Sequence, residues 1–175
     1  GLQTSFGYNT LALDQGKPVL MGLKELIRCF VEFREEVITR RTRFLLREAR
    51  KRAHTLIGLA VSVVNLDPVI ELIRKAPDPV VARERLIERA WPVTEIASYI
   101  ELVGEPGRGV VDGTYRLSEE QAKAILELRL QRLTGLERDK ILAELKDIVD
   151  QIADFIAILA SRERLYTILR DELIA

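Results

Sequence analysis

Apolar residues recur at steps of three and four between positions 23 and 66, and this spacing predicts one long helix. No Pro interrupts the stretch, and its only interior Gly is Gly58. At roughly 1.5 Å per residue such a helix extends on the order of 60 Å, so its apolar stripe needs a partner of similar length. The stripe, which shifts by one residue at its middle, consists of Leu23, Leu26, Phe30, Phe33, Val37, Ile38, Thr42, Leu45, Ala49, Ala53, Leu56, Ala60 and Val63.

The partner is predicted near the end of the sequence, where an alternating four-three apolar spacing continues from Ile141 to Leu173. Only Arg162 interrupts this seam, and a kink or new turn near Ser161 would explain the interruption. Sustained apolar heptads are typical of a coiled coil. Residues 22–65 carry ten basic and five acidic side chains, whereas residues 137–175 carry six and nine. These opposite charge excesses favour pairing within the chain, as an antiparallel helical hairpin.

The predicted fold is therefore mainly α, with a long antiparallel helical hairpin forming a coiled-coil stalk and a small helical head. Within residues 1–22, apolar and polar side chains alternate weakly on both sides of the turn signal Asp14-Gln15-Gly16. This segment is expected to form a short β-hairpin. We divide the rest into a first long helix at 23–66, a head at 67–136, and a return helix with a following helix at 137–175.

Turn and capping residues divide the head. Asp67 before Pro68 predicts a helix through Lys75, and Asp78 before Pro79 predicts a second helix through Ala90. Thr94–Val103 is expected to be helical, and residues 110–117 are expected to include an extended piece. Ser118 and Gln121 form a capping box that opens a further helix, 118–133.

The helix 118–133 has two apolar stripes rather than one. Ala122, Leu126, Leu130 and Leu133 form the first, whereas Ile125 and Leu128 lie on another face beside Gln121 and Arg132. One stripe is sufficient to pack on the head, so the second indicates an association interface or a helix enclosed inside the head. On the first alternative, the interface residues are Gln121, Ile125, Leu128, Arg132 and Leu133.

Basic residues gather in the middle of the first helix. Such a cluster can contact nucleic-acid phosphates without sequence preference, or it can be a solvated face paired with Asp147, Asp150 and Asp154. No aromatic residues alternate with the basic ones as stacking platforms, which favours the solvated face. The possible weak DNA contacts are Arg40, Arg41, Arg43, Arg47, Arg50 and Lys51. His54 is the only histidine and is interpreted as structural.

Composition excludes several classes of function. The formal net charge is zero, and the single Cys29 indicates a reducing compartment without an internal disulfide. No apolar run reaches the roughly 20 residues of a membrane span, and no signal peptide is recognised. We find no nucleophile–base pair and no metal-ligand cluster, so catalytic and metal-binding residues are predicted to be absent. The sequence lacks an initiator Met and is expected to be part of a larger protein.

Several strings in the chain resemble the A subunits of type IIA DNA topoisomerases, and bacterial gyrase more than topoisomerase IV. The similarity extends in order over nearly the whole chain. Its motifs are Arg40-Arg41-Thr42, Ala49-Arg50-Lys51-Arg52-Ala53-His54, Asn65-Leu66-Asp67-Pro68-Val69-Ile70-Glu71-Leu72-Ile73-Arg74, and the run from Gln121 to Glu137, which contains Leu133-Thr134-Gly135-Leu136-Glu137.

The resemblance implies the end of the tower domain, the coiled-coil arms and the dimerising head that forms the DNA exit gate, or C-gate. The family cleaves DNA with a tyrosine that follows an arginine, and none of Tyr8, Tyr99, Tyr115 and Tyr166 does so here. The resemblance thus implies no catalysis by this region alone. The parent enzyme would be an ATP-hydrolysing type II topoisomerase in the bacterial cytoplasm, acting on double-stranded DNA.

The implied partners are a second copy of the chain and the B subunit of gyrase, in an A2B2 enzyme. No cofactor is expected in this region, because ATP and Mg²⁺ belong to the B subunit of that family.

Two other classes of function remain: a stand-alone coiled-coil module for DNA binding or dimerisation, and an enzyme with an unrecognised site. Salt-dependent binding of duplex DNA would favour the first.

Overall fold

The computed structural model describes residues 3–4, 7, 9–105, 107–128 and 135–175 of the chain. These residues form two compact units, which are described separately. The hairpin unit consists of Gly1–Arg43 and Ile158–Ala175, and the head unit is Phe44–Ala157. Two helices, α1 (Leu23–Val64) and α6 (Gly135–Ala160), contribute segments to both units. The mainly α fold with a helical hairpin and an N-terminal β-hairpin is confirmed.

The hairpin unit begins with the predicted antiparallel pair, β1 (Leu11–Asp14) and β2 (Lys17–Leu20). Leu11 lies opposite Leu20, and Asp14 lies opposite Lys17. The turn residues Gln15 and Gly16 have φ of 48° and 79°, as a tight turn between twisted strands requires. The predicted turn signal was therefore correct.

Helix α1 begins at the predicted Leu23 and ends two residues before the predicted Leu66. From Ile38 onwards the predicted stripe is largely buried, with Ile38, Ala53 and Ala60 fully enclosed. Its first half differs, because Leu23 and Phe33 are 63% and 61% exposed. The periodicity thus predicted the helix correctly along its length, whereas burial of the stripe holds only for the second half.

The seam break near Ser161 is confirmed as the end of one helix and the start of another. The side chain of Ser161 accepts a hydrogen bond from Arg164 N–H and begins α7 (Arg162–Ile174). Within the hairpin unit, the Arg162 guanidinium lies 3.0 Å from the Glu35 carboxylate of α1, and Arg34 lies 2.6 Å from Glu172. Leu165 and Leu169 of α7 are buried. Ion pairs therefore attach α7 to α1.

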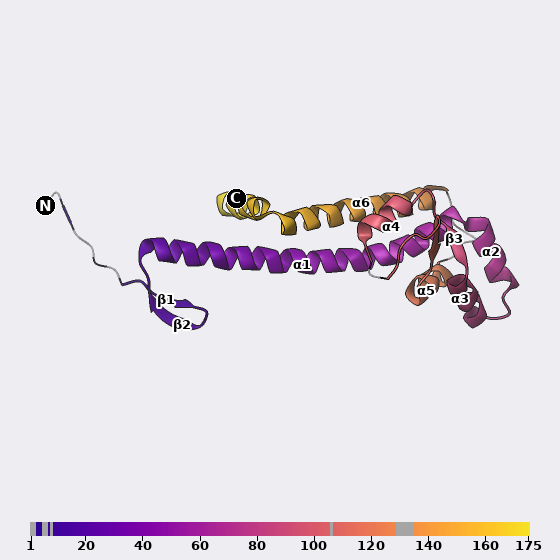
Figure 1. Ribbon diagram of the computed structural model, residues 1–175, viewed down its shortest axis with the longest axis horizontal. Helices are drawn as coiled ribbons and strands as arrows, with labels where there is room; N and C mark the ends of the chain where they lie inside the picture. The colour runs from indigo at the N-terminus through magenta and orange to yellow at the C-terminus, as the bar shows by residue number, and fades with distance from the viewer. Residues whose placement is uncertain (1–2, 5–6, 8, 106, 129–134) are drawn as a thin grey trace. The chain divides into compact units, whose positions relative to one another are not determined.

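In the head unit, α6 lies beside the second half of α1 (Figure 1). Leu145 and Ile152 of α6 are almost fully buried in the same cluster as Leu56 of α1. The Arg52 guanidinium pairs with the Glu144 carboxylate, Nε to Oε1 2.9 Å. Burial of such side chains contributes roughly 1.5–3 kcal/mol each, so apolar packing dominates over the exposed ion pair.

The head comprises α2 (Leu66–Lys75), α3 (Pro79–Glu88), β3 (Ala90–Pro92), α4 (Ala97–Val103), β4 (Thr114–Arg116) and α5 (Glu119–Glu127). The Asp78 cap is confirmed, since its carboxylate accepts from Val81 N–H at 2.8 Å. The prediction that Asp67 is the N-cap of the first head helix is wrong. Helix α2 begins at Leu66 with Asn65 at the N-cap, so Asp67 already lies inside the first turn.

The second head helix was predicted to continue to Ala90, but α3 ends at Glu88. Arg89 is extended, and Ala90–Pro92 pairs antiparallel with β4, Trp91 opposite Tyr115. Trp91 is fully buried and its Nε1–H donates to Leu86 O at 2.9 Å. Burial of this large ring with a satisfied N–H explains why the chain leaves the helix here.

Helix α5 is also shorter than predicted. It ends at Glu127, and Leu128 is extended at its C-cap, with ψ of 127°. The remaining predicted positions up to Leu133 lie outside the described residues. Over the ranges described, no single helix has the length and hydropathy of a membrane span. The bent pair α1–α2, which turns by 92°, passes that test only when its two helices are joined.

Candidate functional site

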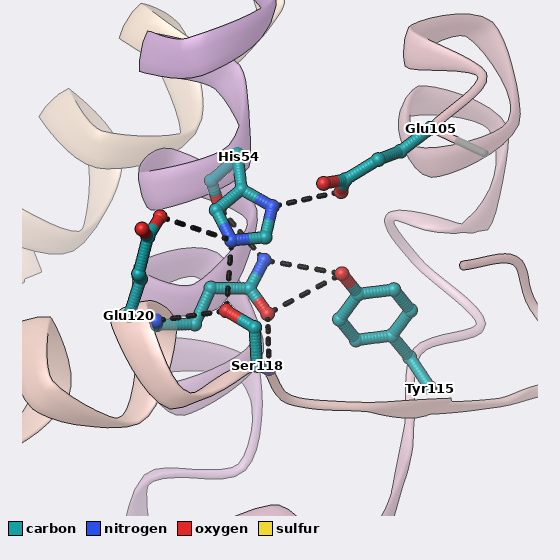
Figure 2. A network of polar contacts seen from close by, with 6 residues as sticks. His54, Glu105, Tyr115, Ser118 and Glu120 are labelled. Atoms are coloured by element: carbon teal, nitrogen blue, oxygen red, sulfur yellow. Dashed lines mark hydrogen bonds and ion pairs between the residues drawn. The ribbon is translucent and has the colours of Figure 1, made fainter. Parts of the chain in front are cut away.

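His54 is a nearly buried polar residue on α1, 9% exposed, where this helix contacts the rest of the head unit. Its Nδ1 lies 2.7 Å from Oε2 of Glu105, and its Nε2 lies 2.7 Å from Oγ of Ser118. Figure 2 shows the imidazole between these two groups, with Glu120 nearby. One side chain therefore connects α1 with the loop after α4 and with the start of α5.

The start of α5 is held by the predicted capping box. The Ser118 hydroxyl accepts from Gln121 N–H at 3.0 Å, and the Gln121 side-chain oxygen accepts from Ser118 N–H at 2.9 Å. Two helix-terminal donors that would otherwise be unpaired are satisfied in this way. The local sequence thus fixes where α5 begins and places Ser118 next to the imidazole.

Gln121 continues the network into the interior and is fully buried. Its Nε2 donates to the His54 carbonyl oxygen at 2.7 Å and lies 3.1 Å from the Tyr115 hydroxyl. A Cβ placed on Gly58 would stand 2.6 Å from Cβ of Gln121, so this contact requires glycine. Gly58 therefore allows α5 to approach the α1 backbone closely.

Tyr115 closes the network on the side of β4, and only 2% of it is exposed. Its pKa is raised above the ordinary value, chiefly because burial disfavours the phenolate, and the Glu105 carboxylate adds to this. The phenol therefore stays neutral at physiological pH and can both donate to and accept from Gln121.

Glu105, His54 and Ser118 have the carboxylate–imidazole–hydroxyl order of a hydrolase relay. Ser118 is only 6% exposed, however, and its hydroxyl already accepts the Gln121 amide. A substrate carbonyl has no approach to this oxygen, so the network holds three segments together rather than performing acyl transfer. Among the described His, Cys, Asp and Glu residues, no group of three is placed to hold a metal ion.

The predicted interface residues have different positions. Gln121 and Ile125 are fully buried by the chain's own head, and so neither presents surface to a partner in this structure. Leu128 is half-buried at the C-cap of α5 and packs partly against the core. Arg132 and Leu133 lie outside the described residues. Association through these five residues stays a prediction.

The six predicted basic residues are divided between the two units, and three of them are engaged locally. Arg40 pairs with Glu36, Arg41 pairs with Glu172, and the Arg47 guanidinium lies 5.4 Å from the Phe44 ring centroid. The other three are exposed and have no carboxylate within ion-pair distance among the described residues: Arg43, Arg50 and Lys51. DNA contact by these residues also stays a prediction.

Sequence reasoning identified Ser118 as a cap but not Glu105 or Tyr115 as partners of His54 and Gln121. Glu105 is 51 residues from His54, in a stretch read only as a loop. The one signal was the lone His54, next to Ala53 of the apolar stripe, since a buried imidazole needs polar partners.

Comparison with known proteins points to one family. The model of the DNA gyrase/topoisomerase IV A-subunit family matches residues 1–174. The chain is 49% identical to the DNA gyrase A subunit of Aeromonas salmonicida, over 99% of this chain and 20% of that protein. It is 50% identical to the DNA gyrase A subunit of Salmonella typhimurium, over 98% of this chain and 21% of that protein. The chain thus spans about a fifth of the length of these relatives.

Proposed function

The chain belongs to the family of DNA gyrase and topoisomerase IV A subunits, and from this premise we propose that it forms the dimerising DNA exit gate of a type II topoisomerase. In this proposal the head is the C-gate, α1 and α6 are the coiled-coil arms, and the β-hairpin is the end of a tower domain. The domain limits of the proposal are 1–22, 23–66, 67–136 and 137–175.

The observation that carries the proposal is the connection of the head to two long helices. Helix α1 leads into α2, and α6 leaves after the last head segment, while their head-unit portions share one apolar core. Two rigid helices that enter and leave one small head can transmit a movement to it as arms. A duplex passed between two such arms would leave when the heads separate.

The proposed interface is centred on Leu128 and the residues that follow it. A two-fold axis lets a segment contact its own copy, so a short apolar segment contributes twice to the buried area. Leu128 is partly uncovered at the end of α5 and continues from the packed Ile125. Gln121 and Ile125 would then support the interface from inside the head.

The proposed parent activity is ATP-dependent strand passage and supercoiling of duplex DNA, with the B subunit of gyrase supplying ATP and Mg²⁺ in an A2B2 enzyme in the cytoplasm. This region would contribute no catalysis, because none of its tyrosines follows an arginine. Tyr115 is in addition buried and bonded to Gln121. Weak duplex contact by Arg43, Arg50 and Lys51 is compatible with release of the duplex, whereas tight binding would oppose it.

Sedimentation equilibrium of the 175-residue chain tests the proposal. We expect a two-fold homodimer at tens of micromolar, with a mass unchanged by added duplex DNA. A monomer whose circular dichroism shows an intact helical fold would contradict the proposal. A dimer that forms only with DNA would instead favour a stand-alone DNA-binding module.

A further inference from the structure

A cleft of about 800 Å³ lies beside the β3–β4 ribbon and adjoins the His54 network at Tyr115, which lines it. Arg116 of β4 pairs in register with the small Ala90 of β3, so one side of the cleft carries an arginine beside a short side chain. The loop between α4 and β4 contributes a second arginine, Arg108, from residues 107–112. A cleft of this volume is in the range of small-ligand sites.

Both arginines lack a fixed anionic partner. Within the described part of the chain, neither Arg108 nor Arg116 forms an ion pair with a carboxylate, and the Arg108 side chain hydrogen-bonds to the neutral Tyr115 hydroxyl. Asp112 is the only acidic residue among those that line the cleft. Two guanidinium groups against one carboxylate give the cleft a net positive charge, and guanidinium groups bind oxyanions with paired, charge-assisted hydrogen bonds.

Two backbone N–H groups of the loop are further candidate hydrogen-bond donors for an anion. The amides of Gly107 and Gly109 have no acceptor among the described residues, and a Cβ on either residue would meet nothing within 4 Å. Both glycines line the cleft together with the two arginines. Unpaired amides next to a backbone residue of positive φ, here 76° at Gly107, are a usual feature of anion-binding loops.

Backbone hydrogen bonds anchor the described residues of this loop at two points. Arg108 N–H donates to Glu105 O at 3.1 Å, and Glu105 is itself bound to His54. At the other end, Val111 and Thr114 exchange two backbone hydrogen bonds of 2.9 Å across the turn at Asp112 and Gly113. Anchoring at both ends reduces the entropy lost when a ligand binds.

We propose that this cleft is a binding site for a phosphate group, held by Arg108, Arg116 and the amides of Gly107 and Gly109. The phosphate can come from the backbone of duplex DNA or from a free phosphate or phosphomonoester, because the donors recognise only the oxyanion. The inference goes beyond the exit-gate proposal and requires neither dimerisation nor strand passage.

The test is amide NMR of the ¹⁵N-labelled chain, titrated at constant ionic strength with inorganic phosphate in one arm and a short DNA duplex in the other. We expect saturable shifts of the Gly107 and Gly109 amides with at least one of the two. The double variant Arg108→Ala, Arg116→Ala should weaken binding at least about tenfold, as loss of charge-assisted hydrogen bonds predicts.

Arg138→Ala is the matched control, because Arg138 is an exposed arginine of the same unit that lies outside the cleft. It should leave the shifts unchanged. Binding of phosphate as well as duplex would identify a site for any accessible phosphate, and binding of the duplex alone would identify the DNA backbone as the source. Absence of saturable shifts in both arms would overturn the proposal, as would equal weakening by Arg138→Ala.

Discussion

At position 58 of α1 the packing against Gln121 admits no side chain larger than hydrogen. The Gln121 Cβ and Cγ would stand 2.6 and 2.8 Å from an added Cβ, and both belong to a side chain that is fully buried and fixed by hydrogen bonds. A glycine inside a helix lowers stability by roughly 1 kcal/mol relative to alanine. At position 58 the close contact between α1 and α5 offsets this loss.

Gly58→Ala should lower the free energy of unfolding by about 1–3 kcal/mol, because overpacking exceeds the gain in helix propensity. Urea unfolding followed by circular dichroism measures this change. Gly135→Ala is the control: Gly135 also belongs to a helix, and an added Cβ there meets nothing within 4 Å. It should leave stability unchanged or raise it by up to about 1 kcal/mol. Equal effects of the two substitutions would contradict the packing argument.

Residue-level prediction succeeded where the interaction is local. Ser118 and Asp78 accept from amides three residues ahead, so the sequence around each contains both partners. Asn65 stands at the N-cap in place of Asp67 without a side-chain capping bond, and its side chain donates instead to Pro92 O at 2.9 Å, a contact across 27 residues. His54 and Glu105 are likewise far apart in the sequence and in contact in the structure. A single sequence gives no information on such distant pairs.

Among the elements, α7 is attached to α1 by carboxylates whose pKa values are shifted. Hydrogen bonding from Arg162 holds the pKa of Glu35 below its ordinary value, and hydrogen bonding from Arg41 does the same for Glu172. A lowered folded-state pKa means stability that is present above the unfolded pKa and is lost as pH falls through the folded value.

The stability of the hairpin unit should therefore decline as pH falls below about 4.5, the ordinary carboxyl pKa, and on through the lowered folded values. The double variant Glu35→Gln, Glu172→Gln should be less stable at neutral pH and show a flatter pH dependence below about 5. Urea unfolding at a series of pH values measures both effects. Glu163→Gln, on the exposed face of the same α7, is the control and should keep the parent slope. An unchanged slope in the double variant would show that these pairs contribute nothing.

Helix periodicity predicted the two long helices but not their exact ends. Helix α1 begins at the predicted residue because the apolar steps of three and four start there. The three-residue strand β3 has no periodicity of its own, and only its pairing with β4 through Trp91 and Tyr115 defines it. Helix α5 stops at Glu127 although apolar spacing continues, because the extended Leu128 already packs against the core.

At the scale of the whole molecule, the chain should neither cleave nor relax supercoiled DNA, with or without Mg²⁺ and ATP. Tyr115 cannot reach a phosphodiester because it is 2% exposed, and Tyr166 is hydrogen-bonded to Glu35 at 3.2 Å. Agarose electrophoresis with and without protease treatment measures nicking, relaxation and covalent attachment. A covalent complex between DNA and any tyrosine would contradict the proposed division between this region and the cleaving part of the enzyme.

Apolar side chains that remain exposed limit what a single chain reveals about assembly. Leu11, Leu13 and Leu20 share one face of the β-hairpin and are each more than 60% exposed. The sequence also predicted that Leu23 and Phe33, as members of the apolar stripe of α1, would be buried. Periodicity identifies an apolar face, but whether the same chain, a second copy or another segment covers that face is decided only by the assembly.

The distinction between gate and stalk can be tested with two arginine substitutions. Leu128→Arg should dissociate the proposed dimer while each protomer stays helical, because both copies bring a positive charge to the two-fold axis and desolvating that pair costs several kcal/mol. Ile152→Arg places the charge in the core between α6 and α1, where Ile152 is 1% exposed. It should lower the unfolding temperature while the heads still associate. Sedimentation equilibrium and thermal circular dichroism on both variants separate association from folding. If Leu128→Arg unfolds the head while the dimer persists at low temperature, the end of α5 belongs to the core, and the interface must lie elsewhere.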